Sequence, residues 1–266
     1  MNRTTNIEIM GIVNLTDDSY FADSRCCGVG QALDAVGRMI GEGAAIIDIG
    51  ACSTRPGAAL VTEEQELQRL SDVLPEIRSA FPDISISIDT FRSSVVKKAY
   101  DMIGEFIVND ISAGEDDPQM LPAVGELGLK YVAMHKRGTP QTMGMLTDYD
   151  DVTASVLAYF EEFSEKALRY GIKEWIVDPG FGFAKTIEQN YQILAELDRF
   201  NVLGRPILVG VSRKSMIYKH FCITPEDALP ATQVLHLKAL QQGASILRVH
   251  DVAEAARTVA LYRLLS

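Results

Sequence analysis

Short runs of apolar residues, rich in Ile and Val, recur along the whole chain. Eight such runs occupy residues 7–14, 45–50, 84–89, 105–110, 130–135, 174–179, 206–212 and 244–251. Their hydrophobicity is almost continuous, which is typical of strands buried on both faces of a parallel sheet and not of strands with one face in water. The pattern therefore predicts an α/β fold.

Longer stretches lie between these runs, with apolar residues at three- and four-residue spacing. The clearest are residues 63–80, 151–170, 187–200 and 252–265, and we expect each to be helical. Eight strands, each followed by a helical stretch, match the size of a closed (β/α)8 TIM barrel. An open doubly wound sheet is the alternative, because a strand count cannot prove closure.

No low-complexity linker divides the chain, so we expect a single domain over residues 1–266. Two connections, 15–30 and 51–62, are long and rich in Gly, Ser, Thr or Asp. Each follows a predicted strand. Long loops at that position in a barrel commonly carry functional residues.

The amino-acid composition and net charge exclude some classes of function. The chain has 266 residues, of which 47% are hydrophobic and 23% charged, and its formal net charge is −11. Such an acidic protein would repel a nucleic-acid backbone, so we expect no nucleic-acid partner. A small anionic ligand would instead need a local cluster of cationic side chains and backbone N–H groups.

No signal peptide or membrane-spanning run is recognisable, so the expectation is a cytoplasmic protein without a membrane partner. The chain has four cysteines, Cys26, Cys27, Cys52 and Cys222. Their spacing fits neither a metal site nor a small disulfide framework, so we expect reduced thiols and assign them no metal.

Polar residues stand at or just beyond the end of each apolar run. In chain order they are Asn14; Asp48, followed by Ser53, Thr54 and Arg55; Asp89; Asn109 and Asp110; His135; Asp178; Arg213 and Lys214; and Arg248 and His250. In a barrel the carboxyl ends of the strands converge on one mouth. We therefore expect a site there for a polar ligand.

Each of these residues, taken alone, has a structural explanation as a turn residue or helix cap. Asp48 lies inside its apolar run, two residues before its end, where it could serve the fold and not a ligand. His135 could likewise be a histidine of the hydrophobic core. As a set, however, they divide by chemistry. Acceptors and an amide come from Asp89, Asn109 and Asp178, and donors suited to phosphate come from Arg55, Arg248 and His250. This division predicts a two-part ligand.

The strand ends also resemble, as strings, the dihydropteroate synthase family. The similar blocks, in order, are MGIVNLTDDSYF, GAAIIDIGACSTRPGA, SIDTFRSSV, IVNDISAGEDDPQM, WIVDPGFGFAKTIEQN, LVGVSRKSM and LRVHDV. One such block would be modest support, whereas the ordered series makes chance a poor explanation. The resemblance implies a barrel enzyme that joins a pterin pyrophosphate to p-aminobenzoate, and a sulfonamide target.

The resemblance also implies residue roles. It assigns the pterin to Asp89, Asn109, Met134, Asp178, Phe183 and Lys214. It assigns pyrophosphate to Asn14, Thr54, Arg55, Arg248 and His250, with Mg²⁺ on Asn14. It assigns p-aminobenzoate to Thr54, Pro56, Phe183, Lys214 and Ser215, and the catalytic roles to Asp89, Asp178, Lys214 and Arg248. A homodimer is the usual assembly of the family, and residues 252–265 could supply an apolar face.

Three positions depart from the common family pattern: Asp17 stands in place of a proline, Ala22 in place of an aspartate, and Cys52 in place of a glutamate. Two alternatives belong to other functional classes. One is a methyltetrahydrofolate-binding methyltransferase of the same pterin-binding superfamily, which would not need the STRPG, SRK and RVHDV blocks together, so their presence decides against it. The other is an inactive paralogue that only binds pterin.

Overall fold

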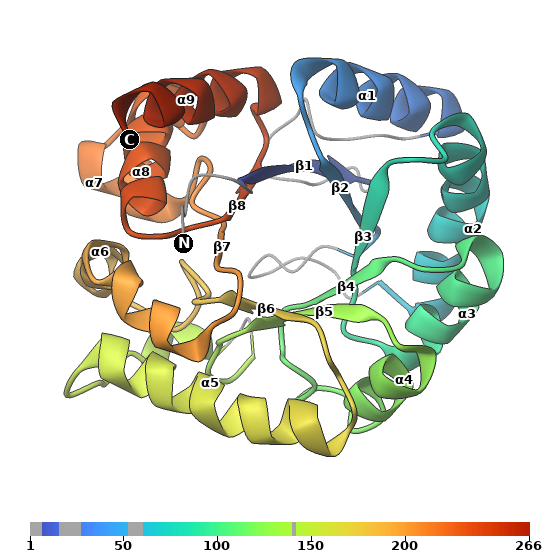
Figure 1. The fold of residues 1–266 in the computed structure, drawn as a ribbon, viewed down its shortest axis with the longest axis horizontal. Helices are drawn as coiled ribbons and strands as arrows, with labels where there is room; N and C mark the ends of the chain where they lie inside the picture. The colour runs from blue at the N-terminus through green and yellow to red at the C-terminus, as the bar shows by residue number, and fades with distance from the viewer. Residues whose placement is uncertain (1–6, 16–27, 53–60, 140–141) are drawn as a thin grey trace.

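The computed structural model describes residues 7–15, 28–52, 61–139 and 142–266, and shows a ring of strands surrounded by helices (Figure 1). The strands are β1 (Glu8–Asn14), β2 (Ile46–Gly50), β3 (Ser85–Asp89), β4 (Ile107–Asp110), β5 (Lys130–Met134), β6 (Trp175–Asp178), β7 (Leu208–Val209) and β8 (Ile246–Val249). The α-helices are α1 (Val29–Glu42), α2 (Glu63–Ala80), α3 (Ser93–Ile103), α4 (Met120–Leu127), α5 (Val152–Arg169), α6 (Ile187–Ala195), α7 (Ser215–Phe221), α8 (Leu229–Gln241) and α9 (Val252–Leu265).

The sheet closes on itself. Within the described residues its strand order is β6-β5-β4-β3-β2-β1-β8-β7, and every neighbouring pair is parallel. The two ends of that order are joined by a parallel bridge between Val177 and Ile207, where the Val177 N–H donates to the Pro206 carbonyl at 2.9 Å. The predicted TIM barrel is thereby confirmed, and the open sheet is set aside.

Local sequence signals fix where several helices begin. Thr62 and Gln65 form a reciprocal capping box at the start of α2, and Thr186 and Gln189 form another at the start of α6. Asp151 caps α5 by accepting from the Ala154 N–H at 3.0 Å. These side chains satisfy N–H groups that have no partner inside the helix, and so set the helix boundaries.

Two predicted elements differ from the structure. The helix expected over 187–200 is α6 followed by a 3₁₀ helix, Leu197–Leu203, in which Leu197 and Phe200 are both buried. Three residues per turn place those two side chains on one face. The strand expected over 206–212 is reduced to Leu208–Val209. Pro206 has no N–H to donate to a neighbouring strand, which accounts for the later start; nothing in the structure explains the early end after Val209.

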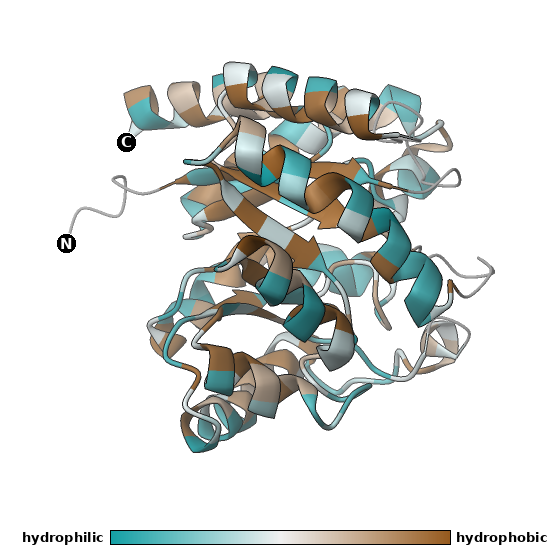
Figure 2. Cartoon of the chain, turned by 90° about the vertical axis from the view of Figure 1, so that its right-hand side faces the viewer, coloured by the Kyte–Doolittle hydropathy of each residue, from teal (hydrophilic) through white to brown (hydrophobic). Residues whose placement is uncertain are grey.

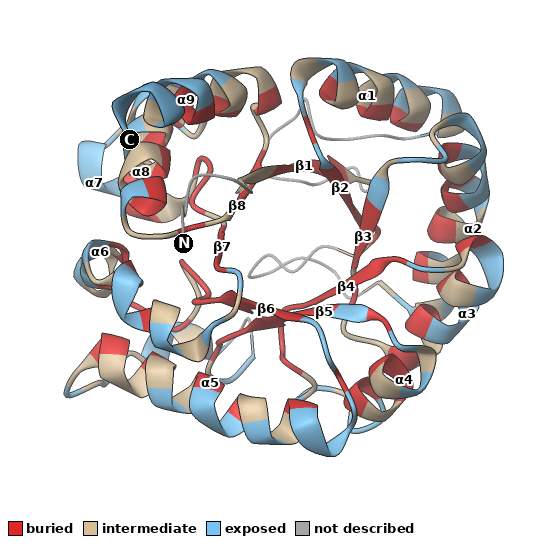
Figure 3. Cartoon of the chain, viewed as in Figure 1, coloured by how far each residue is buried: buried red, intermediate tan, exposed pale blue. Residues whose placement is uncertain are grey.

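Two apolar layers make up the core. The larger lies between the sheet and the helices, and the smaller fills the inside of the barrel. The strands are accordingly buried and largely apolar, whereas the helices turn exposed, polar faces outward (Figures 2 and 3). Burial of each large aliphatic side chain stabilises the fold by about 1.5–3 kcal/mol. Among the described helices, none combines the length and apolarity needed to cross a lipid bilayer.

Candidate active site

The inside of the barrel has an apolar floor and, nearer the mouth, a polar layer. The floor consists of Met10, Ile46, Ile107, Val132, Ile176, Leu208 and Ile246. Residues two positions further along a strand point to the same side. The next layer therefore contains Ile12, Asp48, Asn109, Met134, Asp178, Gly210 and Arg248. Charged groups thus stand directly above a surface that excludes water from below.

A buried network joins Asp48, Asn109, Asp89 and Arg248. The fully buried Asp48 carboxylate accepts from Arg248 Nε at 2.7 Å and from Asn109 Nδ2 at 3.1 Å. Another Arg248 nitrogen, Nη2, lies 2.6 Å from Asp48 Oδ2 and 3.0 Å from Asp89 Oδ2. The network crosses the barrel interior between β2, β3, β4 and β8, and it fixes the Arg248 guanidinium in one orientation.

The charges in this network are not balanced, because two carboxylates share one guanidinium. Burial raises the pKa of Asp89 to about 7; Arg248 opposes the shift and Asp48 adds to it. Burial would lower the pKa of Arg248, but Asp48 and Asp89 raise it above its usual value. Asp89 is therefore a carboxyl group poised near neutrality beside a permanently charged Arg248, an arrangement that is frequent at functional sites.

Asp178 and Lys214 stand on the β6 and β7 sides of the mouth. Asp178 Oδ1 accepts from the Gly180 N–H at 2.8 Å, and burial raises the pKa of Asp178 although Lys214 opposes the shift. Lys214 Nζ donates to the Phe181 carbonyl and lies 4.8 Å from the centre of the Phe183 ring. Burial lowers the pKa of Lys214 to about 8. The pair offers an acceptor and a donor beside an aromatic surface.

Asn14, at the end of β1, meets Asp89 over Gly50. A side chain at Gly50 would place its Cβ 3.3 Å from Asn14 Oδ1 and 4.0 Å from Asp89 Oδ2. Gly50 thus leaves room for oxygen ligands from two strands to converge. Such donors suit Mg²⁺, which needs only one or two protein oxygens when water and phosphate oxygens complete its coordination.

His250 lies beyond β8, against Ser212. Its Nδ1 is 3.0 Å from Ser212 Oγ, and its backbone N–H donates to the same oxygen at 3.2 Å. Ser212 Oγ thus binds both the backbone and the ring of His250 and holds the imidazole in place. Burial, and then Arg248, lower the pKa of His250 to about 3, so it is a neutral imidazole and not a cation.

Three of the polar residues at the strand ends do not join the site. Asp110 accepts from Tyr131 Oη at 2.6 Å, and further from the backbone of its own turn. Arg213 forms a bidentate pair with Asp251 and donates to two carbonyl groups. The His135 ring packs edge-on against Tyr159 of α5. These side chains point into the barrel wall and hold it together.

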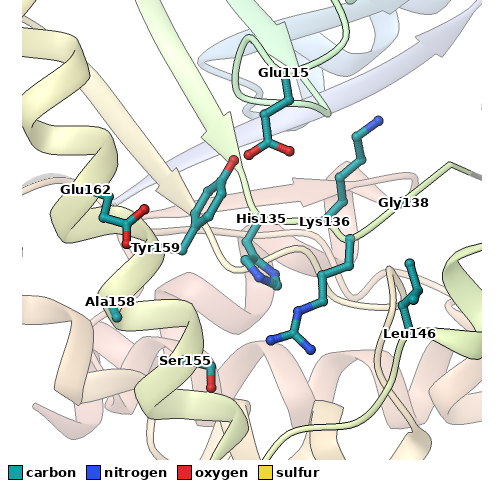
Figure 4. A pocket seen from close by; sticks show the side chains of 10 residues that line it. Glu115, His135, Lys136, Gly138, Leu146, Ser155, Ala158, Tyr159 and Glu162 are labelled. Carbon is teal, nitrogen blue, oxygen red and sulfur yellow. The ribbon is translucent and has the colours of Figure 1, made fainter.

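A separate cavity of about 510 Å³ lies outside the barrel, between the segments after β4 and β5 and helix α5. Figure 4 shows Tyr159 pointing toward Glu115, with His135 forming the wall nearest the sheet. The residues of the polar layer described above do not line it. The inside of the barrel, and not this cavity, holds the convergent polar groups.

The sequence matches the family described as pterin binding enzyme over residues 10–250. It is 41% identical to the dihydropteroate synthase of Escherichia coli K12 over 248 residues, which cover 92% of this chain and 87% of that protein. It is 36% identical to the dihydropteroate synthase of Bacillus subtilis, over 94% of this chain and 85% of that protein. The chain belongs to the dihydropteroate synthase family.

Solved structures of dihydropteroate synthases share the fold of this chain. The Yersinia pestis enzyme, in complex with a sulfonamide drug, has a TM-score of 0.93 at 35% identity, over 98% of this chain and 95% of that one. The Thermus thermophilus enzyme, in complex with 4-aminobenzoate, has a TM-score of 0.87 at 34% identity, over 99% and 96%. These relatives favour a synthase over the methyltransferase alternative.

For a dihydropteroate synthase, the structure gathers most of the expected positions at one mouth. Asn14, Asp89, Asn109, Met134, Asp178, Phe183, Lys214, Arg248 and His250 lie on the inner face or in the turns that follow it, and Ser215 begins α7 directly after Lys214. Thr54, Arg55 and Pro56 lie outside the described residues, as do Asp17 and Ala22.

Asp48 is the residue whose place the sequence left open. It holds both Arg248 and Asn109, and is completely buried. Asp48 lies two residues beyond the inward-facing Ile46, so both side chains are on the same face of β2. The sequence of a strand that is buried on both faces does not show which of its two faces points into the barrel.

Cys52, the third departure from the family pattern, follows β2 near Glu66 and Arg92. Its thiol forms no disulfide, and burial, then Glu66, raise its pKa. A thiol with a raised pKa is a poor nucleophile. The local electrostatics therefore do not favour covalent chemistry at Cys52.

Proposed function

We propose that the mouth of this barrel condenses (7,8-dihydropterin-6-yl)methyl diphosphate with p-aminobenzoate, giving 7,8-dihydropteroate and pyrophosphate. This is the transferase step of folate biosynthesis for which the relatives are named. One observation carries the proposal: the Asp48–Asn109–Asp89–Arg248 network stands over an apolar floor beside Asp178 and Lys214. This arrangement offers acceptors, a donor and a fixed cation to a flat polar ring that carries an anionic group.

The pterin end is proposed to lie deepest, on Asp89, Asn109 and Asp178, with Met134, Phe183 and Lys214 beside it. A pterin presents a ring N–H next to an exocyclic amine, and one carboxylate can accept from both. Asp178 is suited to that role because it is nine-tenths buried, at 8% exposure, and its Oδ1 is oriented by the Gly180 N–H. Asn109 can donate to and accept from the remaining edge.

The pyrophosphate is proposed to bind Asn14, Arg248 and His250, together with Thr54 and Arg55. Arg248 is held rigidly by Asp48, so little conformational entropy is lost when it meets phosphate oxygens. His250 adds a neutral imidazole. We propose that Asn14 contributes an oxygen to Mg²⁺, which would neutralise charge on the phosphate oxygens.

The p-aminobenzoate is proposed to lie nearer the mouth, against Phe183, Lys214 and Ser215, together with Thr54 and Pro56. The Phe183 ring supplies a flat apolar surface, and Lys214 stands over it at 4.8 Å. A sulfonamide resembles p-aminobenzoate in its anilino group. The same surface would therefore accept it, which makes the protein a sulfonamide target.

In this mechanism the residues stabilise separated charge and do not act as nucleophiles. When the bond between the pterin methylene and the pyrophosphate breaks, positive charge spreads over the pterin and negative charge appears on the leaving group. Asp89 and Asp178 stabilise the first, and Arg248, His250 and Arg55 the second, in a site shielded from water. The amine of p-aminobenzoate then attacks the methylene carbon and loses a proton.

We also propose that residues 1–266 act as one domain, that the chain works in the cytoplasm, and that it forms a homodimer.

The exposed apolar side chains Leu261, Leu264 and Leu265 of α9 offer a contact surface for a second copy. Sedimentation of the wild type beside Leu261→Lys tests this assembly. A wild-type protein that sediments as a monomer at micromolar concentration would refute the dimer.

The decisive experiment supplies purified protein with the dihydropterin pyrophosphate, radiolabelled p-aminobenzoate and Mg²⁺, and measures labelled dihydropteroate. We expect product that disappears with EDTA and returns with added Mg²⁺. If no product forms but calorimetry detects pterin binding, the chain is the inactive paralogue. Product that survives EDTA would remove Mg²⁺ from the proposal while leaving the reaction.

A further inference from the structure

A second buried cluster lies behind the turn that follows β6, and the reaction as proposed does not use it. At its centre is Lys185, which is 8% exposed. Lys185 Nζ donates to the Gly180 carbonyl at 2.9 Å and to the Phe183 carbonyl at 3.0 Å, and lies 3.1 Å from His135 Nδ1. One ammonium group thus binds both ends of the turn and anchors them to a side chain that follows β5.

The turn between Gly180 and Ala184 has an unusual backbone. Gly180, Gly182 and Ala184 have φ angles of +72°, +82° and +48°. A side chain at Gly180 would place its Cβ 2.0 Å from the His135 carbonyl oxygen. Glycine adopts such angles without strain, so only Ala184 needs its surroundings to hold it there. Lys185 restrains the turn together with Asn190, whose Oδ1 accepts from the Gly182 N–H at 2.7 Å.

This turn determines the geometry of the proposed substrate site. Its first N–H, on Gly180, orients Asp178 Oδ1. Its Phe181 carbonyl accepts from Lys214 Nζ, and its Phe183 ring lies beneath the same ammonium group. Lys185 Nζ contacts the turn at the Gly180 and Phe183 carbonyls and lies beside His135 Nδ1. It therefore acts on the site through the turn, and its charge also acts on Asp178.

The electrostatics of the cluster match this arrangement. Burial, and then Lys185, lower the pKa of His135 to about 2, so His135 is neutral and its Nδ1 accepts from the ammonium group. Burial also lowers the pKa of Lys185 to about 7, with Asp178 opposing the shift and Lys214 and Arg137 adding to it. His135 also lines the cavity in Figure 4.

We propose that Lys185 is a positioning residue, which together with His135 holds the turn Gly180–Ala184 so that Phe183 and Lys214 can receive p-aminobenzoate. The inference rests on the proposed function for its kinetic consequence. Its structural part, that Lys185 restrains this turn, is independent of the reaction.

The test compares Lys185→Met with Lys185→Arg, which keeps a cation, and with Lys173→Met, which removes an exposed lysine elsewhere. Deuterium uptake of peptides that cover residues 180–184 provides a measurement that needs no activity. We expect uptake there to increase on the order of tenfold in Lys185→Met while peptides from β1 and β2 are unchanged. Lys185→Arg should recover part of the protection, and Lys173→Met should resemble the wild type.

Kinetics connect the turn to the site. In Lys185→Met we expect the KM for p-aminobenzoate to increase on the order of tenfold, with a smaller change in kcat, because the aromatic surface is displaced. The increase in KM for p-aminobenzoate should nearly vanish when Lys185→Met is added to Phe183→Ala, because the aromatic ring that the turn positions is then absent. Effects that multiply in the double variant would mean a general structural role and would overturn the proposal.

The remaining outcomes are equally distinct. Unchanged deuterium uptake in Lys185→Met overturns the restraint, whereas faster uptake with wild-type KM and kcat overturns its link to the site. If the wild-type protein makes no dihydropteroate, the reaction proposal fails and the uptake data still decide the restraint. If Lys185→Met does not fold, deuterium uptake over residues 180–184 is measured in His135→Leu, for which we expect a smaller increase.

Discussion

Polar residues near the strand ends of this barrel fall into two groups, one pointing into the barrel and one into its wall. In the wall, Asp110 and Arg213 have protein partners for nearly all of their hydrogen-bonding capacity, including Tyr131 and Asp251. Inside, Asp48 and Asp89 share the single guanidinium of Arg248. Asp48 is as completely buried as Asp110, while Asp89 and Arg248 are partly exposed, so burial alone does not separate site from scaffold.

The difference lies in how completely the protein compensates each charge. A wall residue with matched partners contributes to the free energy of unfolding and has no capacity left for a ligand. Burial raises the pKa of Asp110 as it raises that of Asp89, so a raised pKa does not separate the two groups. The difference is that Asp110 is surrounded by hydrogen-bond donors of its own turn and Tyr131, whereas Asp89 and Asp48 share one guanidinium. Incomplete compensation at a rigid position is what a site needs if it is to stabilise a cationic transition state.

The largest expected effect comes from removing an inner cation. We expect Arg248→Ala or Lys214→Ala to lower kcat/KM on the order of 10²–10³-fold, because each removes stabilisation of charge in a dry site. Circular dichroism should show that the barrel is retained. Arg169→Ala, at an exposed position on α5, is the control. Rates near the wild type in either inner variant would refute the site assignment.

The second test uses pH. Asp89, with a raised pKa, is protonated and neutral below about 7, and Lys214, with a lowered pKa, is uncharged above about 8. If both charged forms are required, kcat/KM falls roughly tenfold per pH unit on each side of that interval. A rate profile from pH 5.5 to 9.5 measures this. Asp89→Asn should remove the acidic limb while keeping the alkaline one; a persistent acidic limb would assign it elsewhere.

A wall substitution should show the opposite behaviour. Tyr131→Phe keeps the buried ring but removes the hydroxyl that donates to Asp110. We expect it to lower the free energy of unfolding by about 1–3 kcal/mol, the cost of an unmade buried hydrogen bond. Urea denaturation measures that loss, and kcat/KM at 25 °C should stay within about twofold of the wild type. A large loss of rate with unchanged stability would abolish the distinction between the two groups.

The smallest effect is expected at Cys52. Burial, then Glu66, raise the pKa of its thiol, so it is not a nucleophile at neutral pH. Cys52→Ala should therefore leave kcat/KM within about twofold of the wild type, and the wild-type enzyme should keep its activity in iodoacetamide. Loss of activity on alkylation that Cys52→Ala prevents would reopen a covalent role.

Much of the fold could be predicted from the sequence, because the alternation of apolar runs and amphipathic stretches is strong. Residues 63–80 and 252–265 form helices with the predicted bounds. Closure could not be predicted, since it depends on the bridge between Val177 and Ile207, which involves only a few atoms. The break after Ala195 was missed because an amphipathic pattern barely distinguishes three from 3.6 residues per turn.

The site shows a sharper limit. Strand-end residues were recognisable, but which of them face the interior was not, because strands that are apolar on both faces carry no two-residue alternation. Asp110 and His135 therefore stand at strand ends like Asp89 and Asp178, although only the last two face the interior. The pairing of Lys185 with His135 links positions 50 residues apart. Such a contact follows from the tertiary arrangement and leaves no local signal.

Both lysines beside the proposed substrate site are anchored to main-chain oxygens: Lys214 to that of Phe181, and Lys185 to those of Gly180 and Phe183. A codon change can replace a side chain, but it cannot delete a carbonyl group. Substitutions at position 181 would thus leave the anchor of Lys214 in place. The anchoring of both lysines thus depends on the path of the main chain and tolerates exchange of the side chains at positions 181 and 183, as long as that path is kept.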